Sequence, residues 1–152
     1  MHRIFLFDDY PVASETLLFR SLLEVEAEKH SLNLHWDEEK SFSAFERRIR
    51  EIEYDILILD IMAKRIGPMK WNSTGHEIPE DLTGIGILQN CRLGKYGHRY
   101  RTCPIFMRSA RGEPYVVRMS MNEGANAYHR IGVEDKELVD RIVVLLKDPM
   151  QV

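Results

Sequence analysis

Three carboxylates follow apolar segments of this sequence, at positions where they could act together. Asp8 and Asp9 come directly after the apolar run 3–7, and Asp60 ends the run YDILILD at residues 54–60. A carboxylate is ionised at neutral pH, so it can bind a hard cation or attack an electrophile without first losing a proton. Its chemistry therefore depends on whether the fold brings the three side chains to one place.

The predicted elements alternate, strand then helix, five times along the chain. The two apolar runs indicate strands buried on both faces, and the alternation of residues 32–37 indicates an edge strand. Such alternation is typical of a parallel sheet with helices on both faces and right-handed crossovers. We therefore expect an α/β fold with a doubly wound five-stranded parallel sheet of order 2-1-3-4-5.

In this order the first and third strands are neighbours at the switch point, where ligands bind beyond the carboxyl ends. Asp8, Asp9 and Asp60 should therefore converge. Carboxylates so close repel one another and raise each other's pKa unless a cation lies between them, and Mg²⁺ is the oxygen-seeking ion that fits. A single Asp after a strand is usually a helix cap, but three of them after all-apolar strands favour a site.

The composition of the chain limits the classes of protein and the kinds of site that it can represent. The chain has 152 residues, of which 44% are apolar and 30% charged, with a net charge of -3. These values fit one soluble domain over residues 1–152, in the cytoplasm, without membrane or direct nucleic-acid binding. Cys91 and Cys103 are too few for a disulfide framework, so we expect them reduced, and no pair of the six histidines has zinc-ligand spacing.

The segments IFLFDD, YDILILD, FMRSA and GANAY resemble the receiver domains of two-component response regulators. The resemblance implies the flavodoxin-like receiver fold and a phosphoryl group transferred to Asp60 from a phosphohistidine on a sensor histidine kinase or a phosphotransfer protein. It also implies Mg²⁺ bound by Asp9, Asp60 and the backbone carbonyl of Met62. Asp8 would act on the same ion mainly through water.

The resemblance further implies two switch residues. Ser109, after the fourth strand, would donate a hydrogen bond to the phosphoryl group, and Tyr128 would be the aromatic residue that turns inward when it does. The run SARGEP suggests a homodimer through the fourth and fifth helices. Few residues follow the last predicted helix, so we expect a stand-alone receiver that acts on an unknown output partner.

The sequence departs from the family pattern at the end of the fifth strand. Ile131 stands where receivers have a Lys, and Gly132 stands where a Pro usually follows. The missing ammonium removes one charge-assisted contact to the phosphoryl group. Arg111 and Arg130 are possible substitutes.

A second departure is the long loop at about 63–81, which contains Lys64, Arg65, Lys70, Trp71 and His76. Connections inside a compact domain are commonly about 4–6 residues. One interpretation is a tolerated surface insertion, because lengthening a loop costs little entropy. The other is a lid or a partner-binding element beside the phosphorylation site.

Two functions agree with these observations, and a third, a phosphatase, is excluded by them. The leading hypothesis is a Mg²⁺-dependent phosphoacceptor that is not an enzyme in its own right and switches partner binding or dimerisation. The alternative is a pseudo-receiver, an interaction module that is not phosphorylated. A haloacid-dehalogenase type phosphatase needs a second Asp two positions after its nucleophile, and Tyr10 and Pro11 occupy those positions.

Overall fold

The computed structural model of the protein describes residues 1–8, 13–65 and 67–148. Asp9, one of the expected metal ligands, lies outside the described residues. The strands are β1 (His2–Phe7), β2 (Leu34–Glu39), β3 (Ile56–Leu59), β4 (Ile105–Ser109) and β5 (Ala127–Arg130). The helices are α1 (Ala13–Lys29), α2 (Phe42–Glu51), α3 (Thr83–Arg92), α4 (Pro114–Asn122) and α5 (Asp135–Lys147), with 3₁₀ turns η1 (Glu80–Leu82) and η2 (His98–Arg101).

The described strands form one parallel sheet in the order β2-β1-β3-β4-β5, which confirms the predicted topology. The register of β1 and β3 places Phe7 opposite Leu59. The amide of Asp60 then donates to the carbonyl of Phe7 at 2.9 Å. Asp8 and Asp60 therefore leave two adjacent strands at the same edge of the sheet.

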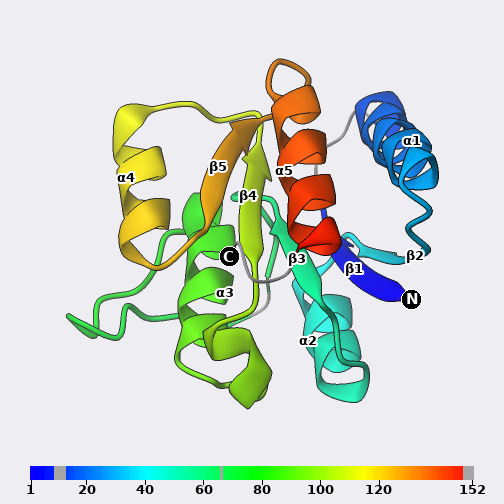
Figure 1. Cartoon of the computed structure of the whole chain (residues 1–152). Helices are drawn as coiled ribbons and strands as arrows, with labels where there is room; N and C mark the ends of the chain where they lie inside the picture. Colours follow the sequence, from blue (N-terminus) through cyan, green and yellow to red (C-terminus); the bar gives the residue numbers. More distant parts are fainter. Residues whose placement is uncertain (9–12, 66, 149–152) are drawn as a thin grey trace.

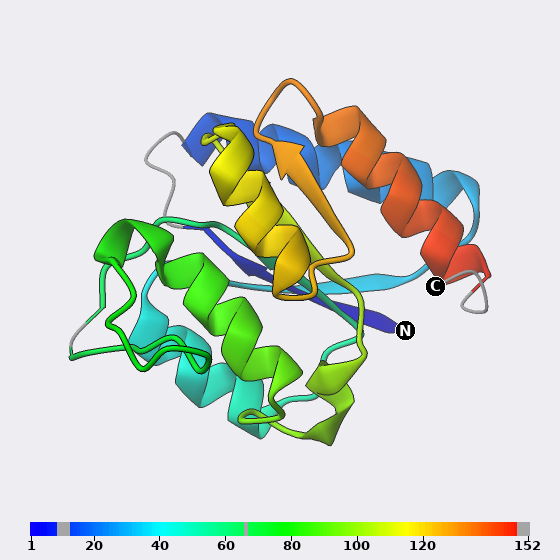
Figure 2. The same cartoon turned by 90° about the vertical axis from the view of Figure 1, so that its left-hand side faces the viewer.

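Helices cover both faces of the sheet, as Figure 2 shows: α1 and α5 lie on one side, and α2 and α3 lie on the other. Each face has its own buried cluster. Phe5, Leu57 and Met107 point to the face of α2, α3 and α4, whereas Ile58 and Phe106 point to the face of α1 and α5. This alternation along each strand explains why the central strands are apolar throughout.

Helix α1 has apolar residues on two faces. The helical spacing of Leu18, Leu22 and Val25 predicts a helix, and the structure confirms it. These side chains are nevertheless exposed, by 60%, 39% and 53%, and the buried stripe includes Phe19 and Leu23. Spacing alone fixes the helical conformation here but leaves open which stripe faces the sheet.

The long loop is an ordered hairpin-like segment beside α3 (Figures 1 and 2). Lys70 and Glu77 form an antiparallel bridge, and the amide of Ile78 donates to the carbonyl of Met69 at 2.6 Å. Met69 and Ile78 are buried in the same cluster as α3, and Trp71 packs against that cluster. Met69 and Ile78 therefore anchor the segment to the core on this face, while residues 72–77 are exposed.

Polar contacts attach the same segment to α3. The guanidinium of Arg65 donates to the carbonyl of Ile78 and to the hydroxyl of Thr83. The side-chain amide of Gln89 donates to the carbonyl of Lys70 at 3.1 Å, and its oxygen accepts from the amide of Asn72 at 2.7 Å. The Lys70 carbonyl and the Asn72 amide of the insertion thus have hydrogen-bond partners on α3, which replace water for these backbone groups.

Two glycines of α3 allow close approach from opposite directions. A Cβ on Gly84 would lie 1.8 Å from the carbonyl oxygen of Asp60, and the Gly84 amide donates to the carbonyl of Ile61 at 2.7 Å. A Cβ on Gly86 would lie 2.2 Å from the sulfur of Met69, in the insertion. Gly84 lets the start of α3 reach the end of β3, and Gly86 makes room for the insertion.

None of the helices in the described part of the chain is both long and apolar enough to cross a membrane.

We expect Gly84→Ala to lower the free energy of unfolding by about 3 kcal/mol, because its added methyl meets the backbone of Asp60, which has little room to shift. Gly86→Ala is the matched control: its methyl meets only the outer side-chain atoms of Met69 and Ile78, which can shift, and Ala also favours the helix, so its cost should stay below about 1 kcal/mol. Urea unfolding measures both. Equal costs for the two variants would contradict the close approach at Asp60.

Candidate functional site

The carboxyl ends of β1 and β3 bring two acidic side chains together in a buried place. Asp8 is 3% exposed and Asp60 is 5% exposed. The Asp60 carboxylate accepts from the amide of Ile61 at 2.7 Å, and Asp8 accepts from the hydroxyl of Thr16 on α1. The convergence expected from the strand order is therefore present for these two residues.

The pKa of Asp60 is raised from 3.8 to about 7, first by burial and then by the negative charge of Asp8. Hydrogen bonds from the amides of Ile61 and Met62 and from the hydroxyl of Ser109 lower this pKa in part but do not offset the rise. A carboxylate that must ionise in a buried place beside another carboxylate is stabilised by a cation. The electrostatics of the site therefore favour a positive ion at Asp60.

The donor set fits Mg²⁺. Asp8 and Asp60 present carboxylate oxygens, which are the ligands that this ion prefers, and the raised pKa of Asp60 shows that their charge is not fully compensated. Asp9 lies outside the described residues, and Met62, whose carbonyl is the remaining expected ligand, follows directly in the chain after Ile61. Asp8, Asp60 and the Met62 carbonyl would hold the ion, together with Asp9.

The two expected switch residues lie next to this pair. Ser109 at the end of β4 is 1% exposed, and its hydroxyl oxygen accepts from the amide of Arg111 at 3.2 Å. The hydroxyl of Tyr128 donates to the carbonyl of Arg111 at 2.6 Å, and burial raises the Tyr128 pKa to about 12. The negative charge of Asp60 also raises the Tyr128 pKa, and a hydrogen bond with Ser109 lowers it, so both residues lie close enough to Tyr128 to act on its hydroxyl.

Neither Arg111 nor Arg130, the two expected substitutes for the missing Lys, forms a hydrogen bond or an ion pair with Asp60 in the described part of the chain; Arg111 is held by other groups, and Arg130 points outward. Arg111 pairs with Glu113 and with Asp81, whose carboxylate is 3.3 Å away. Hydrogen bonding to Glu113 raises the Arg111 pKa. Arg130 is exposed at the end of β5, and its side chain lies against Gly112.

A third arginine, Arg108 on β4, is buried beside Asp8. Its side chain is 1% exposed, and one of its amino groups lies 3.5 Å from the Asp8 carboxylate. The same guanidinium forms a bidentate ion pair with Asp135, in which Nε donates to Oδ1 at 2.9 Å and Nη2 donates to Oδ2 at 3.1 Å. Arg108 is not among the site residues predicted from the sequence, although a single Arg inside the apolar strand IFMRS is the signal that could have revealed it.

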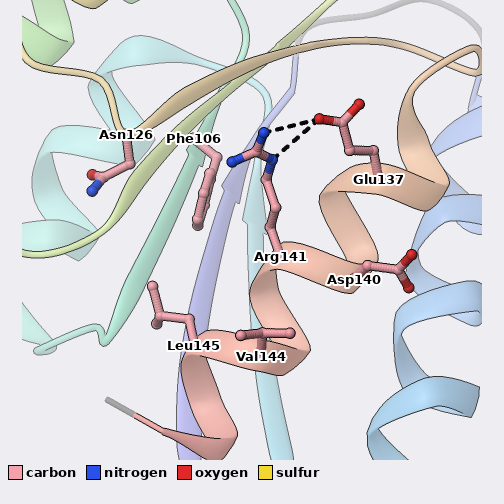
Figure 3. A pocket seen from close by; sticks show the side chains of 7 residues that line it. All are labelled: Phe106, Asn126, Glu137, Asp140, Arg141, Val144 and Leu145. Atoms are coloured by element: carbon pink, nitrogen blue, oxygen red, sulfur yellow. Dashed lines mark hydrogen bonds and ion pairs between the residues drawn. The ribbon is translucent and has the colours of Figure 1, made fainter. Parts of the chain in front are cut away.

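One hollow lies away from these residues. A hollow of about 520 Å³ lies between α5 and the strands β4 and β5, lined in part by Phe106, Asn126 and Val144. Figure 3 shows Arg141 turned toward Glu137 along α5, with which it pairs at 3.0 Å. No buried carboxylate lines this hollow in the described part of the chain, so the candidate site is at Asp8 and Asp60.

Comparison with solved structures identifies the fold. The chain superposes on the CheY-like response regulator receiver domain protein of Methanospirillum hungatei with a TM-score of 0.67 and 16% identity, covering 99% of this chain and 98% of that one. The receiver domain of a Francisella response regulator gives 0.67 at 15% identity, with 97% and 98% covered. The BeF₃-activated receiver domain of Klebsiella pneumoniae RstA gives 0.62 at 19%, with 97% and 100% covered.

No protein-family model matches the sequence, and no curated protein matches it. The likeness to receiver domains therefore rests on the fold, which these neighbours share over nearly the whole chain.

The raised pKa of Asp60 predicts how stability varies with pH in metal-free buffer. The folded pKa of about 7 exceeds the ordinary 3.8, so the folded state holds the proton more tightly. Ionisation of Asp60 then destabilises the fold as pH rises from about 4 to 7, by up to about 4 kcal/mol. Asp60→Asn avoids this cost, so it should exceed the wild type in stability at pH 8 and approach it near pH 4.

Chemical denaturation across this pH range in the presence of a chelator measures the difference between the two proteins. Asp140→Asn, which alters an exposed carboxylate on α5, is the control and should follow the wild type. Parallel curves for wild type and Asp60→Asn would show that Asp60 ionises freely, contrary to its burial beside Asp8.

Proposed function

We propose that this chain, which has the fold of response regulator receiver domains, is a cytoplasmic phosphoacceptor whose phosphorylated residue is Asp60. The donor is a phosphohistidine of a sensor histidine kinase or a phosphotransfer protein. The observation that supports this most is the buried pair of Asp8 and Asp60, with Ser109 beside it, at the switch point of the sheet.

The reaction needs a nucleophile and a way to balance charge. An Asp60 oxygen attacks the phosphorus, the new P–O bond forms as the P–N bond of the phosphohistidine breaks, and the imidazole leaves with the bonding electron pair. Bound Mg²⁺ supplies positive charge to the phosphoryl oxygens and the carboxylates. The amide of Ile61 holds one Asp60 oxygen, which orients the carboxylate for attack.

Ser109 and Tyr128 connect the phosphoryl group to the surface. The Ser109 hydroxyl can donate to a phosphoryl oxygen on Asp60, in place of its present contacts. Arg111 connects the two switch residues, because its amide donates to the Ser109 hydroxyl oxygen and its carbonyl accepts from the Tyr128 hydroxyl. A move of Ser109 would therefore change the surface of α4 and β5. That surface is where we place binding of an output partner or a second copy, as a shift between two states.

A pseudo-receiver is the second candidate function. Ile131 is buried at the position of the missing Lys, and Gly132 follows it. A module of this kind would bind its partner without phosphorylation. Asp60→Asn would then leave partner binding unchanged, whereas the phosphoacceptor proposal expects the phosphate-dependent part of binding to be lost.

Incubation with acetyl phosphate and Mg²⁺ should add one phosphoryl group to the wild-type protein, detected by mass spectrometry of the intact chain. Asp60→Asn should give no adduct because the attacking oxygen is lost, and Asp140→Asn should behave as the wild type. Ser109→Ala should slow the reaction about tenfold or more, since a hydrogen bond to a charged group contributes about 1.5–3 kcal/mol. An unmodified wild-type chain, or an equal adduct on Asp60→Asn, would overturn the proposal.

A further inference from the structure

The carboxylates and the guanidinium that the described part of the chain buries form one network. The buried carboxylates are those of Asp8, Asp60 and Asp135, and the buried guanidinium is that of Arg108. Arg108 lies between Asp8, at the end of β1, and Asp135, at the start of α5.

The guanidinium is fixed on several sides. The bidentate pair with Asp135 sets the plane of the Arg108 guanidinium. The guanidinium carbon Cζ lies 4.5 Å from the centre of the Phe19 ring on α1. A further amino contact reaches the carbonyl of Glu15 at 3.4 Å. A planar cation held in this way presents its remaining amino group to Asp8 in a defined direction.

The end of β5 is built around the same carboxylate. Asp135 accepts from the amide of Gly132 at 3.1 Å, in addition to the bonds from Arg108. Gly132 has a φ of +80°, and a proline there could not adopt this φ or donate that bond. The segment that has Ile131 in place of a Lys is therefore anchored to the acid that also anchors Arg108.

From these contacts we infer that Arg108 is the fixed cation of the site, and that its charge beside Asp8 limits how strongly the acidic pair attracts Mg²⁺. This inference rests on the proposed Mg²⁺ site. Arg108 on β4 places a fixed positive charge beside Asp8, whereas position 131 holds an uncharged Ile. It acts through Asp8, since its own donors are directed at Asp8, Asp135 and Glu15.

The sign of the effect on Mg²⁺ separates this role from a structural one. A guanidinium 3.5 Å from Asp8 repels any divalent cation that Asp8 binds, so its removal strengthens Mg²⁺ binding. If Arg108 only supported the fold, its loss would loosen Asp8 and weaken Mg²⁺ binding. Asp135 has the opposite effect on Mg²⁺ affinity, because its carboxylate balances part of the guanidinium charge. Without that negative charge, Arg108 pairs more strongly with Asp8 and Mg²⁺ binding weakens.

Isothermal titration of Mg²⁺ into the variants provides the test. Arg108→Met should bind Mg²⁺ at least fivefold more tightly than the wild type, and Asp135→Asn should bind it several-fold more weakly. Arg108→Lys keeps the charge and should stay within about twofold. Arg118→Met, which removes an exposed cation from α4, is the control and should leave the affinity unchanged.

If Arg108→Met fails to fold, Arg108→Gln removes the same charge while keeping a hydrogen-bonding group for Asp135, and the same tightening is expected. Weaker or unchanged binding in the neutral variants overturns the inference, as does a tightening in Arg130→Met with none at Arg108. Mg²⁺ binding by the wild type without phosphoryl acceptance overturns the proposed function alone. A wild-type chain that binds no Mg²⁺ overturns both.

Discussion

The burial of Asp8 and Asp60 side by side is the constraint on which the rest of the site depends. The register of β1 and β3 forces them together, because the residues before them, Phe7 and Leu59, are paired across the two strands. Two like charges in a place that excludes water are costly unless positive charge and hydrogen bonds compensate them. The surrounding contacts, from the Ile61 amide to Arg108, are understood as partial compensation.

This compensation connects several elements of the fold. Arg108 joins β4 to α5 through Asp135, and Thr16 joins α1 to Asp8. On the opposite face, Gly84 lets the start of α3 meet the backbone of Asp60. The acidic pair is therefore held from both faces of the sheet, so a change of charge at Asp60 acts on elements of both faces.

Much of this could be predicted from the sequence. The strand order and the meeting of Asp8 and Asp60 follow from apolar runs that end in carboxylates, because such runs specify buried parallel strands. The partners of Arg108 could not be predicted in this way, since pairing across β4, α1 and α5 depends on tertiary packing. The same holds for Met69, whose place against Gly86 turns an irregular segment into core, and for α1, where two apolar stripes compete for one buried face.

A crystal structure of the protein with saturating Mg²⁺ and beryllofluoride is the measurement that shows whether Asp60 is the phosphoacceptor. The account predicts beryllium bonded to an Asp60 carboxylate oxygen, the Ser109 hydroxyl within hydrogen-bonding distance of a fluoride, and Mg²⁺ at the acidic pair. Arg108 should remain paired with Asp135 beside Asp8. An Asp60 side chain without beryllofluoride under these conditions would contradict the assignment of this residue as the phosphoacceptor.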